Sequence, residues 1–120
     1  MPRMGHRKVM VVEDDHLIRE AIAEALDEEG FEVLEAANGR EALDKLHNEH
    51  ASLVLLDLMM PVMDGWQFRE AQLHDPEISS IPVVVLSAVK DEKVPAQRHF
   101  SKPCDLDELL DTVWEFTGGP

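Results

Sequence analysis

Short apolar runs alternate with longer amphipathic segments along this chain of 120 residues. The apolar runs predict β-strands at residues 8–12, 31–35, 52–57, 82–87 and 98–101. The amphipathic segments predict helices at residues 16–29, 39–48, 65–74 and 106–117. Strands that alternate with helices in this way are typical of a parallel sheet with helices on both faces, so we expect an α/β fold.

Two of the predicted helices begin with the spacing of a capping box. Asn38 stands three positions before Glu41, and Asp105 stands three positions before Glu108. In a capping box the first side chain accepts a hydrogen bond from the backbone of the later residue, whose own side chain reaches back. We therefore expect a capping box at the start of both helices.

The connection between the last two predicted strands is short. Only eleven residues, 87–97, lie between Leu86 and Arg98, and they include Pro95. A parallel crossover usually needs about ten to twelve residues or more. Because proline also disfavours helix just before it, we expect at most one or two helical turns at residues 90–94, so that a fourth helix is shortened or absent.

Composition and charge narrow the class of protein. Eleven basic and twenty-five acidic residues give a net charge of −14, which repels nucleic acid and anionic lipid. The single cysteine, Cys104, cannot form an internal disulfide, and no apolar stretch predicts a signal peptide or a membrane span. We expect a cytoplasmic protein with one domain at residues 8–117, a leader at 1–7 and a tail at 118–120.

Polar residues follow four of the predicted strands. Glu13 and Asp14 follow the first strand, Asp57 ends the third, Ser87 ends the fourth and Lys102 follows the fifth. The carboxyl ends of parallel strands lie on one edge of a sheet, so these side chains are expected to meet. Each residue alone has an ordinary explanation, as a helix cap, a turn former or a solvated lysine. Their joint placement favours a site.

The expected site has the chemistry of phosphoryl transfer. Three converging carboxylates repel one another, and a hard divalent cation such as Mg²⁺ removes that repulsion. Asp57 then becomes a nucleophile for a phosphoryl group, because such transfer needs mostly positioning and neutralised charge. Lys102 and Ser87 are expected to bind two of the phosphoryl oxygens.

The sequence resembles the receiver domain of two-component response regulators over residues 7–117. The matching segments are residues 12–15, 55–65, 82–88 and 102–103. The resemblance implies a flavodoxin-like, doubly wound sheet of five parallel strands in the order 2-1-3-4-5.

By resemblance, the acids take separate roles. Asp57 is the phosphoacceptor, Asp14 binds Mg²⁺ directly, and Glu13 acts on the metal through water. The backbone carbonyl of Met59 is a further metal ligand. Asp15 is expected to lie outside this ligand set.

The resemblance also assigns the residues around the phosphoryl group. Ser87 is the switch hydroxyl, and Lys102 pairs with the phosphoryl group. Pro61 and Gly65 have structural roles in the loop after the phosphoacceptor. Pro103 is expected to follow a cis peptide bond, which suits an X-Pro bond.

His99 departs from the family pattern, in which Tyr or Phe occupies this position and moves with the switch hydroxyl. Either His99 takes the aromatic role or the coupling is altered, and a half-exposed histidine on an edge strand is the plain alternative. Because histidine side chains titrate near neutral pH, His99 is also a candidate for pH sensitivity.

The short crossover is the second departure. Many family members use the face formed by their fourth helix, fifth strand and last helix for dimerisation or output, and that use is doubtful here. The missing helix could expose Trp114 and Phe116, although packing at the edge of the core is the favoured interpretation. Cys104 is expected to be a small buried apolar residue.

The sequence therefore predicts a signalling switch. Asp57 receives a phosphoryl group from a sensor histidine kinase or a histidine phosphotransfer protein and loses it by Mg²⁺-dependent hydrolysis, without turnover of a free substrate. A receiver that only binds partner proteins is the alternative. A haloacid-dehalogenase-type phosphatase is disfavoured because Met59 replaces its second acid, and a flavin carrier is disfavoured because the acids at 13–15 repel a phosphate.

Overall fold

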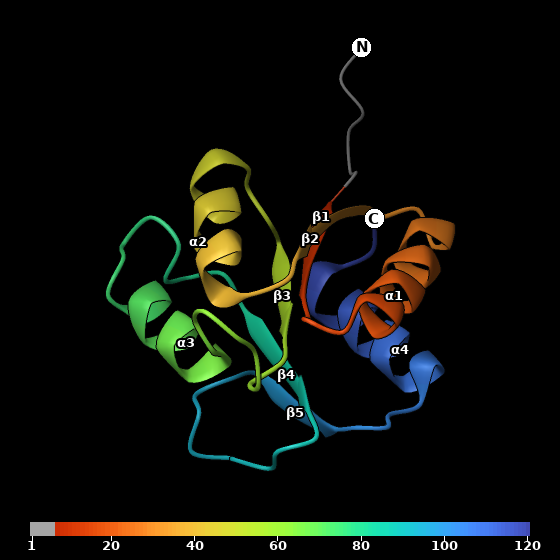
Figure 1. Ribbon diagram of the computed structural model, residues 1–120. Helices are drawn as coiled ribbons and strands as arrows, with labels where there is room; N and C mark the ends of the chain where they lie inside the picture. The colour runs from red at the N-terminus through yellow and green to blue at the C-terminus, as the bar shows by residue number, and fades with distance from the viewer. Residues whose placement is uncertain (1–6) are drawn as a thin grey trace.

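The computed structural model describes residues 7–120, which fold into five strands and four helices (Figure 1). The strands are β1 (Lys8–Val12), β2 (Glu32–Ala36), β3 (Leu53–Leu56), β4 (Val83–Ser87) and β5 (Arg98–Ser101). The helices are α1 (His16–Glu28), α2 (Gly39–Asn48), α3 (Gly65–Leu73) and α4 (Leu106–Thr117). The sequence pattern placed every one of these elements within one residue at each end. None of the helices in residues 7–120 is long and apolar enough to cross a membrane.

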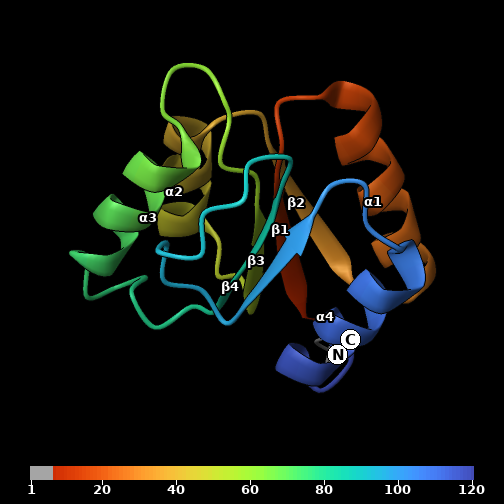
Figure 2. The same cartoon turned by 90° about the horizontal axis from the view of Figure 1, so that it is seen from below.

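All strand pairs in the sheet are parallel, and the strand order is β2-β1-β3-β4-β5, as predicted (Figure 2). The chain runs outward from β1 to β2, returns to β3 on the other side of β1, and continues to β4 and β5. The order therefore reverses between β1 and β3. The carboxyl ends of these two strands are the place where α/β sheets bind ligands.

Helices cover both faces of the sheet, with α2 and α3 on one face and α1 and α4 on the other (Figure 1). All four residues of β3 are buried. Val54 and Leu56 pack into the core under α2 and α3, whereas Leu53 and Leu55 pack into the core under α1 and α4. This alternation follows from the two-residue period of a strand, and burial on both faces explains why β3 is apolar throughout.

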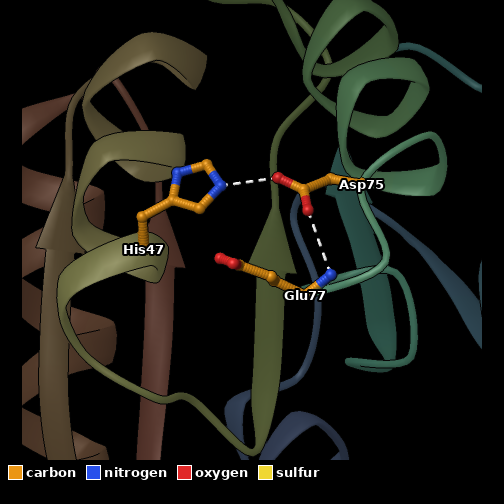
Figure 3. A group of neighbouring side chains, drawn as sticks. All are labelled: His47, Asp75 and Glu77. Carbon is orange, nitrogen blue, oxygen red and sulfur yellow. Dashed lines mark hydrogen bonds and ion pairs between the residues drawn. The ribbon is translucent and has the colours of Figure 1, made fainter.

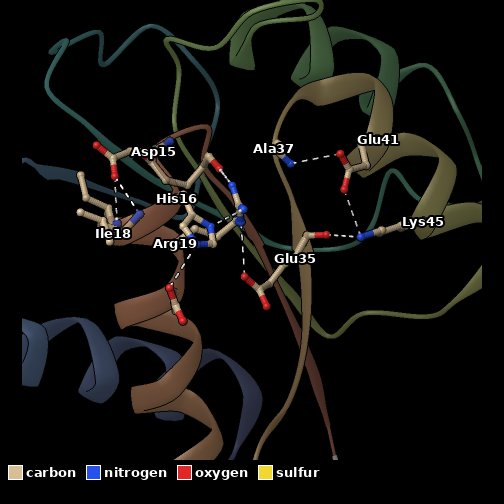
Figure 4. A network of polar contacts seen from close by, with 11 residues as sticks. Asp15, His16, Ile18, Arg19, Glu35, Ala37, Glu41 and Lys45 are labelled. Atoms are coloured by element: carbon tan, nitrogen blue, oxygen red, sulfur yellow. Dashed lines mark hydrogen bonds and ion pairs between the residues drawn. The ribbon is translucent and has the colours of Figure 1, made fainter.

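The predicted capping boxes were only half right. Asn38 accepts a hydrogen bond of 2.9 Å from the amide of Glu41, but the Glu41 carboxylate accepts from Ala37 at 3.4 Å and lies 3.1 Å from Lys45 (Figure 4). The Glu41 carboxylate thus bonds to the residue before the N-cap instead of completing the reciprocal bond with Asn38.

The start of α4 also has only one half of a capping box. Asp105 accepts hydrogen bonds from the amides of Asp107 and Glu108. The complete box stands instead at α3, where Asp64 and Gln67 exchange both bonds at 2.9 and 3.0 Å.

Residues 88–97 connect β4 to β5 without a helix, as the short crossover predicted. Side chains of α3 hold this segment in place. Trp66 donates a hydrogen bond of 2.9 Å from its ring nitrogen to Asp91, and Arg69 donates one of 2.7 Å to the carbonyl of Pro95. Polar contacts to α3 thus fix a segment that lacks helical hydrogen bonds of its own.

Trp114 and Phe116 on α4 pack at the edge of the core, as the favoured interpretation predicted. Trp114 packs edge-on against Phe31 with ring centres 6.0 Å apart, and it donates to Glu29 at 3.2 Å. These partners lie at the end of α1 and just after it, so the exposure of Trp114 does not result from the missing helix. Phe116 packs at the edge of the core beneath the guanidinium group of Arg98, which lies 5.3 Å from the ring centre.

Gln72 on α3 is expected to stabilise the fold through buried hydrogen bonds. Its side chain is fully buried, accepts a hydrogen bond from Arg69 at 2.8 Å and donates to the carbonyls of Ile78 and Ile81 at 2.9 and 3.0 Å. Gln72→Ala leaves these buried groups without partners, so we expect it to lower the free energy of unfolding by about 3 kcal/mol. Urea denaturation measures this change.

The matched control is Gln67→Ala on the same helix. Gln67 is exposed and only completes the capping box, so its loss should cost roughly 1 kcal/mol or less. Equal losses for the two variants would contradict a structural role for the buried Gln72 contacts.

Candidate functional site

The register between β1 and β3 brings two acids together at the edge of the sheet. Val12 pairs with Leu56, so the residues that follow them, Glu13 and Asp57, lie side by side. The Asp57 amide donates a hydrogen bond of 3.0 Å to the carbonyl of Val12, and the Glu13 amide donates one of 2.9 Å to Ala36. The backbone of both acids is therefore fixed by the sheet itself.

Asp14 joins these two acids. Carboxylate oxygens of Glu13, Asp14 and Asp57 all lie within 4.8 Å of one another. Glu13 and Asp57 are only 3% and 5% exposed, whereas Asp14 is exposed to solvent. Oxygen donors that are partly buried and open on one side suit a hard cation such as Mg²⁺, so the donor set fits the ion that the family implies.

Asp15, the next residue, serves α1 instead. Its carboxylate accepts hydrogen bonds of 3.0 and 3.1 Å from the amides of Leu17 and Ile18, which makes it the N-cap of the helix (Figure 4). Asp15 therefore does not belong to the cluster of Glu13, Asp14 and Asp57.

Lys102 supplies the positive charge of the site. Its amine lies 2.8 and 2.7 Å from the two carboxylate oxygens of Glu13 and 3.4 Å from Asp57. Its backbone amide donates a hydrogen bond of 3.0 Å to the carbonyl of Ser87, and the peptide bond between Lys102 and Pro103 is cis, as expected. Residues far apart in sequence thus form one ion-paired group.

Burial and charge shift the pKa values of this group. Burial raises the pKa of Glu13 to about 7, against the lowering effect of the bond from Lys102, and the charge of Asp57 adds to the rise. For Lys102, burial lowers the pKa, but the bond and charge of Glu13 and the charge of Asp57 outweigh burial and raise it. Lys102 is therefore charged near neutral pH, and the loss of the proton from Glu13 is costly.

Ser87 ends β4 at the same edge of the sheet. Val85 pairs with Leu56, so Ser87 lies one residue beyond the level of Asp57. The Ser87 side chain is buried, and its oxygen accepts a hydrogen bond of 3.2 Å from the amide of Val89. Its own hydrogen is consequently available to a further acceptor.

Gly65 allows the loop after Asp57 to fold back onto the strand. A β-carbon at Gly65 would lie 2.5 Å from the carbonyl oxygen of Asp57 and 2.7 Å from the α-carbon of Leu58, which no side chain could occupy. The Gly65 amide donates to the Leu58 carbonyl at 2.9 Å. The close packing at this glycine fixes the backbone of Asp57.

Met59 and Pro61 lie in the same loop with exposed side chains. The amide of Met59 donates a hydrogen bond of 3.4 Å to a carboxylate oxygen of Asp57. The next turn of the loop is strained, since Val62 has a φ of 69° and the amide of Met63 donates to Pro61 at 2.7 Å. Nothing in the sequence signalled this turn, because valine rarely adopts such a conformation.

Arg19 is a positioning residue that the sequence analysis missed. Its guanidinium group donates to the carbonyl of Glu13 at 2.8 Å, pairs with Glu35 at 3.3 Å and contacts His16 at 3.2 Å (Figure 4). Arg19 thereby holds the loop between β1 and α1 against β2. A lone arginine within a helix gives no sequence signal for this contact.

His99 points to the crossover. Its ring nitrogen Nε2 donates a hydrogen bond of 2.9 Å to the carbonyl of Val94, which is itself buried. Among residues 7–120, its hydrogen bond therefore joins β5 to the segment that replaces the fourth helix.

An apolar hollow of about 410 Å³ lies beside the site, between α1 and α4. Ile18, Leu86, Leu106 and the half-buried Cys104 contribute to its lining, and Lys102 lies at its edge. Burial raises the pKa of the Cys104 thiol, with the charge of Asp105 in support, which agrees with an apolar packing role.

The shifted Glu13 predicts a pH dependence of stability in the absence of divalent metal. Because the pKa of Glu13 is higher in the folded chain than in an unfolded one, the folded state holds the proton more tightly. Raising the pH from the unfolded value towards 7 and beyond should then lower the free energy of unfolding, on the order of 2 kcal/mol. Urea denaturation at pH 5.5 and 8.0 in EDTA measures the loss.

Glu13→Gln is the matched variant, because glutamine has a similar shape and no titrating group. It should lose this part of the pH dependence. A wild type and a Glu13→Gln variant with the same change between the two pH values would contradict the proposed cause.

Comparison with known proteins agrees with this geometry. The family model "Response regulator receiver domain" matches residues 9–114. Sporulation initiation phosphotransferase F of Bacillus subtilis strain 168 is 33% identical over 120 residues, which cover 94% of this chain and 95% of that protein. The chain spans about half the length of several other curated relatives, at 54% and 50%.

Solved structures give the same result. The receiver domain of a signal transduction histidine kinase from Syntrophus aciditrophicus superposes with a TM-score of 0.86 at 27% identity, over 93% of this chain and 90% of that one. Response regulator TrrA of Thermotoga maritima, solved in complex with Mg(2+)-BeF, superposes with a TM-score of 0.81 at 30% identity, over 92% and 98%. The chain therefore belongs to the receiver-domain family of two-component response regulators.

Proposed function

We propose that this chain is a phosphoacceptor switch that receives a phosphoryl group on Asp57. The observation that carries the proposal is the position of the Asp57 carboxylate, which is buried between the acids of the β1 end and the amine of Lys102, 3.4 Å away. A carboxylate held in this way has the fixed position and the compensating charge that phosphoryl transfer requires.

The proposed reaction is a transfer from phosphohistidine. An oxygen of Asp57 forms a bond to phosphorus while the bond from phosphorus to the histidine nitrogen breaks, and the histidine leaves with that electron pair. Hydrolysis of the resulting acyl phosphate by water restores the carboxylate and releases inorganic phosphate. The chain thus catalyses only its own modification and its reversal.

Two side chains of the site are suited to bind the transferred group. Lys102 need move only a short distance from Glu13 to reach an oxygen attached to Asp57. Within residues 7–120 the Ser87 hydroxyl donates to no other group, so at the neighbouring strand end it can donate to a second oxygen. Both interactions neutralise charge on the transferred group.

Glu13, Asp14 and Asp57, with the backbone carbonyl of Met59, are the residues that we propose to hold Mg²⁺. When bound, the ion supplies the positive charge that balances the acids and the phosphoryl oxygens. The solved complex of the Thermotoga relative with Mg(2+)-BeF is consistent with this assignment.

A sensor histidine kinase or a histidine phosphotransfer protein is the proposed phosphoryl donor. The apolar hollow between α1 and α4 borders Lys102, and Leu17 on α1 is 75% exposed next to it. Apolar surface beside the nucleophile suits a protein donor better than a small charged molecule. The net charge of −14 disfavours direct contact with nucleic acid or anionic membrane.

We propose residues 8–117 as the functional unit. The proposed tail is residues 118–120, and it begins with Gly118, whose φ of 79° ends α4 in a left-handed cap. The proposed leader is residues 1–7, nearly all of which lie outside the described residues.

Incubation with Mg²⁺ and acetyl phosphate tests the proposal. The wild type should gain one phosphoryl group in its intact mass, and EDTA should prevent the gain. Asp57→Asn should gain none, whereas Asp44→Asn, which changes an exposed acid on α2, should behave as the wild type. A folded wild type that binds Mg²⁺ but gains no phosphoryl group would instead support a receiver that acts only by binding proteins.

We also propose that His99 replaces the aromatic switch residue of the family. Its hydrogen bond to the Val94 carbonyl joins β5 to the crossover, so removing this bond should alter how far the crossover moves when Asp57 is phosphorylated.

Fluorescence of Trp66 measures this change, because its ring nitrogen is bonded to Asp91 in the crossover. The background variant Trp114→Phe removes the signal from α4. His99→Phe in that background should change the size of the fluorescence response to phosphorylation. An equal response with and without His99→Phe would exclude His99 from the coupling.

A further inference from the structure

A second group of metal-binding side chains lies at the opposite end of the sheet from Asp57. His47 is in the last turn of α2, and Asp75 and Glu77 are in the loop after α3 (Figure 3). The end of α2 leads into the start of β3, so this group lies near the amino ends of the strands. It is therefore separate from the acids that follow the carboxyl ends.

The three side chains converge on one point. One ligand atom from each residue lies within 4.8 Å of the other two. Nε2 of His47 is 2.6 Å from Oδ2 of Asp75, and the carboxylate of Glu77 points towards the histidine ring (Figure 3). Among the described residues, the Glu77 carboxylate has no hydrogen-bond or ion-pair partner, so it is available to a ligand.

A neighbouring backbone amide fixes the side chain of Asp75. The amide of Glu77 donates a hydrogen bond of 3.0 Å to Oδ1 of Asp75, which leaves Oδ2 turned to His47. The hydrogen bond with Asp75 raises the pKa of His47, and the charges of Asp75 and Glu77 add to the rise. A histidine ring that faces two carboxylates is placed to share a metal ion with them.

We propose that His47, Asp75 and Glu77 bind a zinc ion, or a similar first-row transition metal, with water completing the coordination. Imidazole and carboxylate are ordinary zinc ligands, and zinc bound by three protein residues keeps an open position. Magnesium and calcium prefer oxygen ligands alone, so the histidine favours a transition metal.

The geometry needs only small side-chain movements. Zinc–ligand distances of about 2.0–2.2 Å set neighbouring ligand atoms about 3.3 Å apart. The His47–Asp75 contact of 2.6 Å must open slightly, and the Glu77 carboxylate must approach. The exposed Glu77 side chain has the freedom to do so. Two carboxylates balance the charge of the ion.

The bound ion would join α2 to the loop between α3 and β4. In the described structure, the contact between His47 and Asp75 is the side-chain hydrogen bond that links these two segments. A ligand that binds only the folded chain stabilises it in proportion to its concentration. We therefore expect zinc to stabilise the folded chain independently of any chemistry at Asp57.

Zinc titration of the full chain in excess Mg²⁺ tests this site, with calorimetry for stoichiometry and thermal unfolding for stability. Excess Mg²⁺ keeps zinc from the acids around Asp57. The wild type should bind zinc, and its Tm should rise by roughly 10 °C when zinc exceeds its Kd a hundredfold. His47→Gln and Glu77→Gln should each weaken that binding by at least about tenfold.

His16→Gln is the matched control, because His16 is also exposed and pairs with a single carboxylate, Glu20, at 3.3 Å. It should bind zinc as the wild type does. Unchanged zinc binding in His47→Gln would show that zinc binds elsewhere. If zinc does not shift the Tm of the wild type, His47 and Asp75 form only an ordinary ion pair. Either result overturns the proposal and leaves phosphorylation of Asp57 untouched.

Discussion

Two buried carboxylates lie side by side at the ends of neighbouring strands, and the site depends on how their repulsion is compensated. The β1–β3 register fixes Glu13 next to Asp57, and neither side chain can escape to solvent. Lys102 supplies the nearest positive charge, and it bonds mainly to Glu13. Burial of Glu13 and the charge of Asp57 raise the pKa of Glu13, although Lys102 lowers it. The site therefore has a deficit of positive charge, which a divalent cation is suited to fill.

The parallel sheet also explains how the other residues of the site come together. Parallel strands of similar length end at one edge, so every residue that follows a strand is brought there by backbone pairing. Lys102 reaches the acids because its own amide bonds to the carbonyl of Ser87 at the end of β4. The glycine at position 65 lets the following loop pack against the backbone of Asp57. Strand register and one close backbone contact thus position the side chains.

The sequence could predict which residues lie at the strand ends, but not most of the contacts that their side chains make. Strand ends and apolar periodicity located Glu13, Asp57, Ser87 and Lys102, because those signals are local. The partner of a polar side chain is not local. Arg19 on α1 donates to the carbonyl of Glu13 and pairs with Glu35 on β2, and the sequence around Arg19 signals neither contact. Contacts that join separate elements need the packed structure, since helix orientation decides which side chains meet.

The crossover at residues 88–97 shows the same limit. It also connects the site to α3. The sequence predicted that a helix would be short or absent, but not what would replace it. The structure replaces it with hydrogen bonds from Trp66 and Arg69 on α3, and with one from the edge strand. The segment begins directly after Ser87, the proposed switch hydroxyl. A displacement of Ser87 therefore acts on residues 88–97, which side chains of α3 hold in place, rather than on a separate helix with its own hydrogen bonds. If phosphorylation changes the surface of this chain, the physical route with the fewest intermediate contacts runs from Ser87 through residues 88–97 to α3.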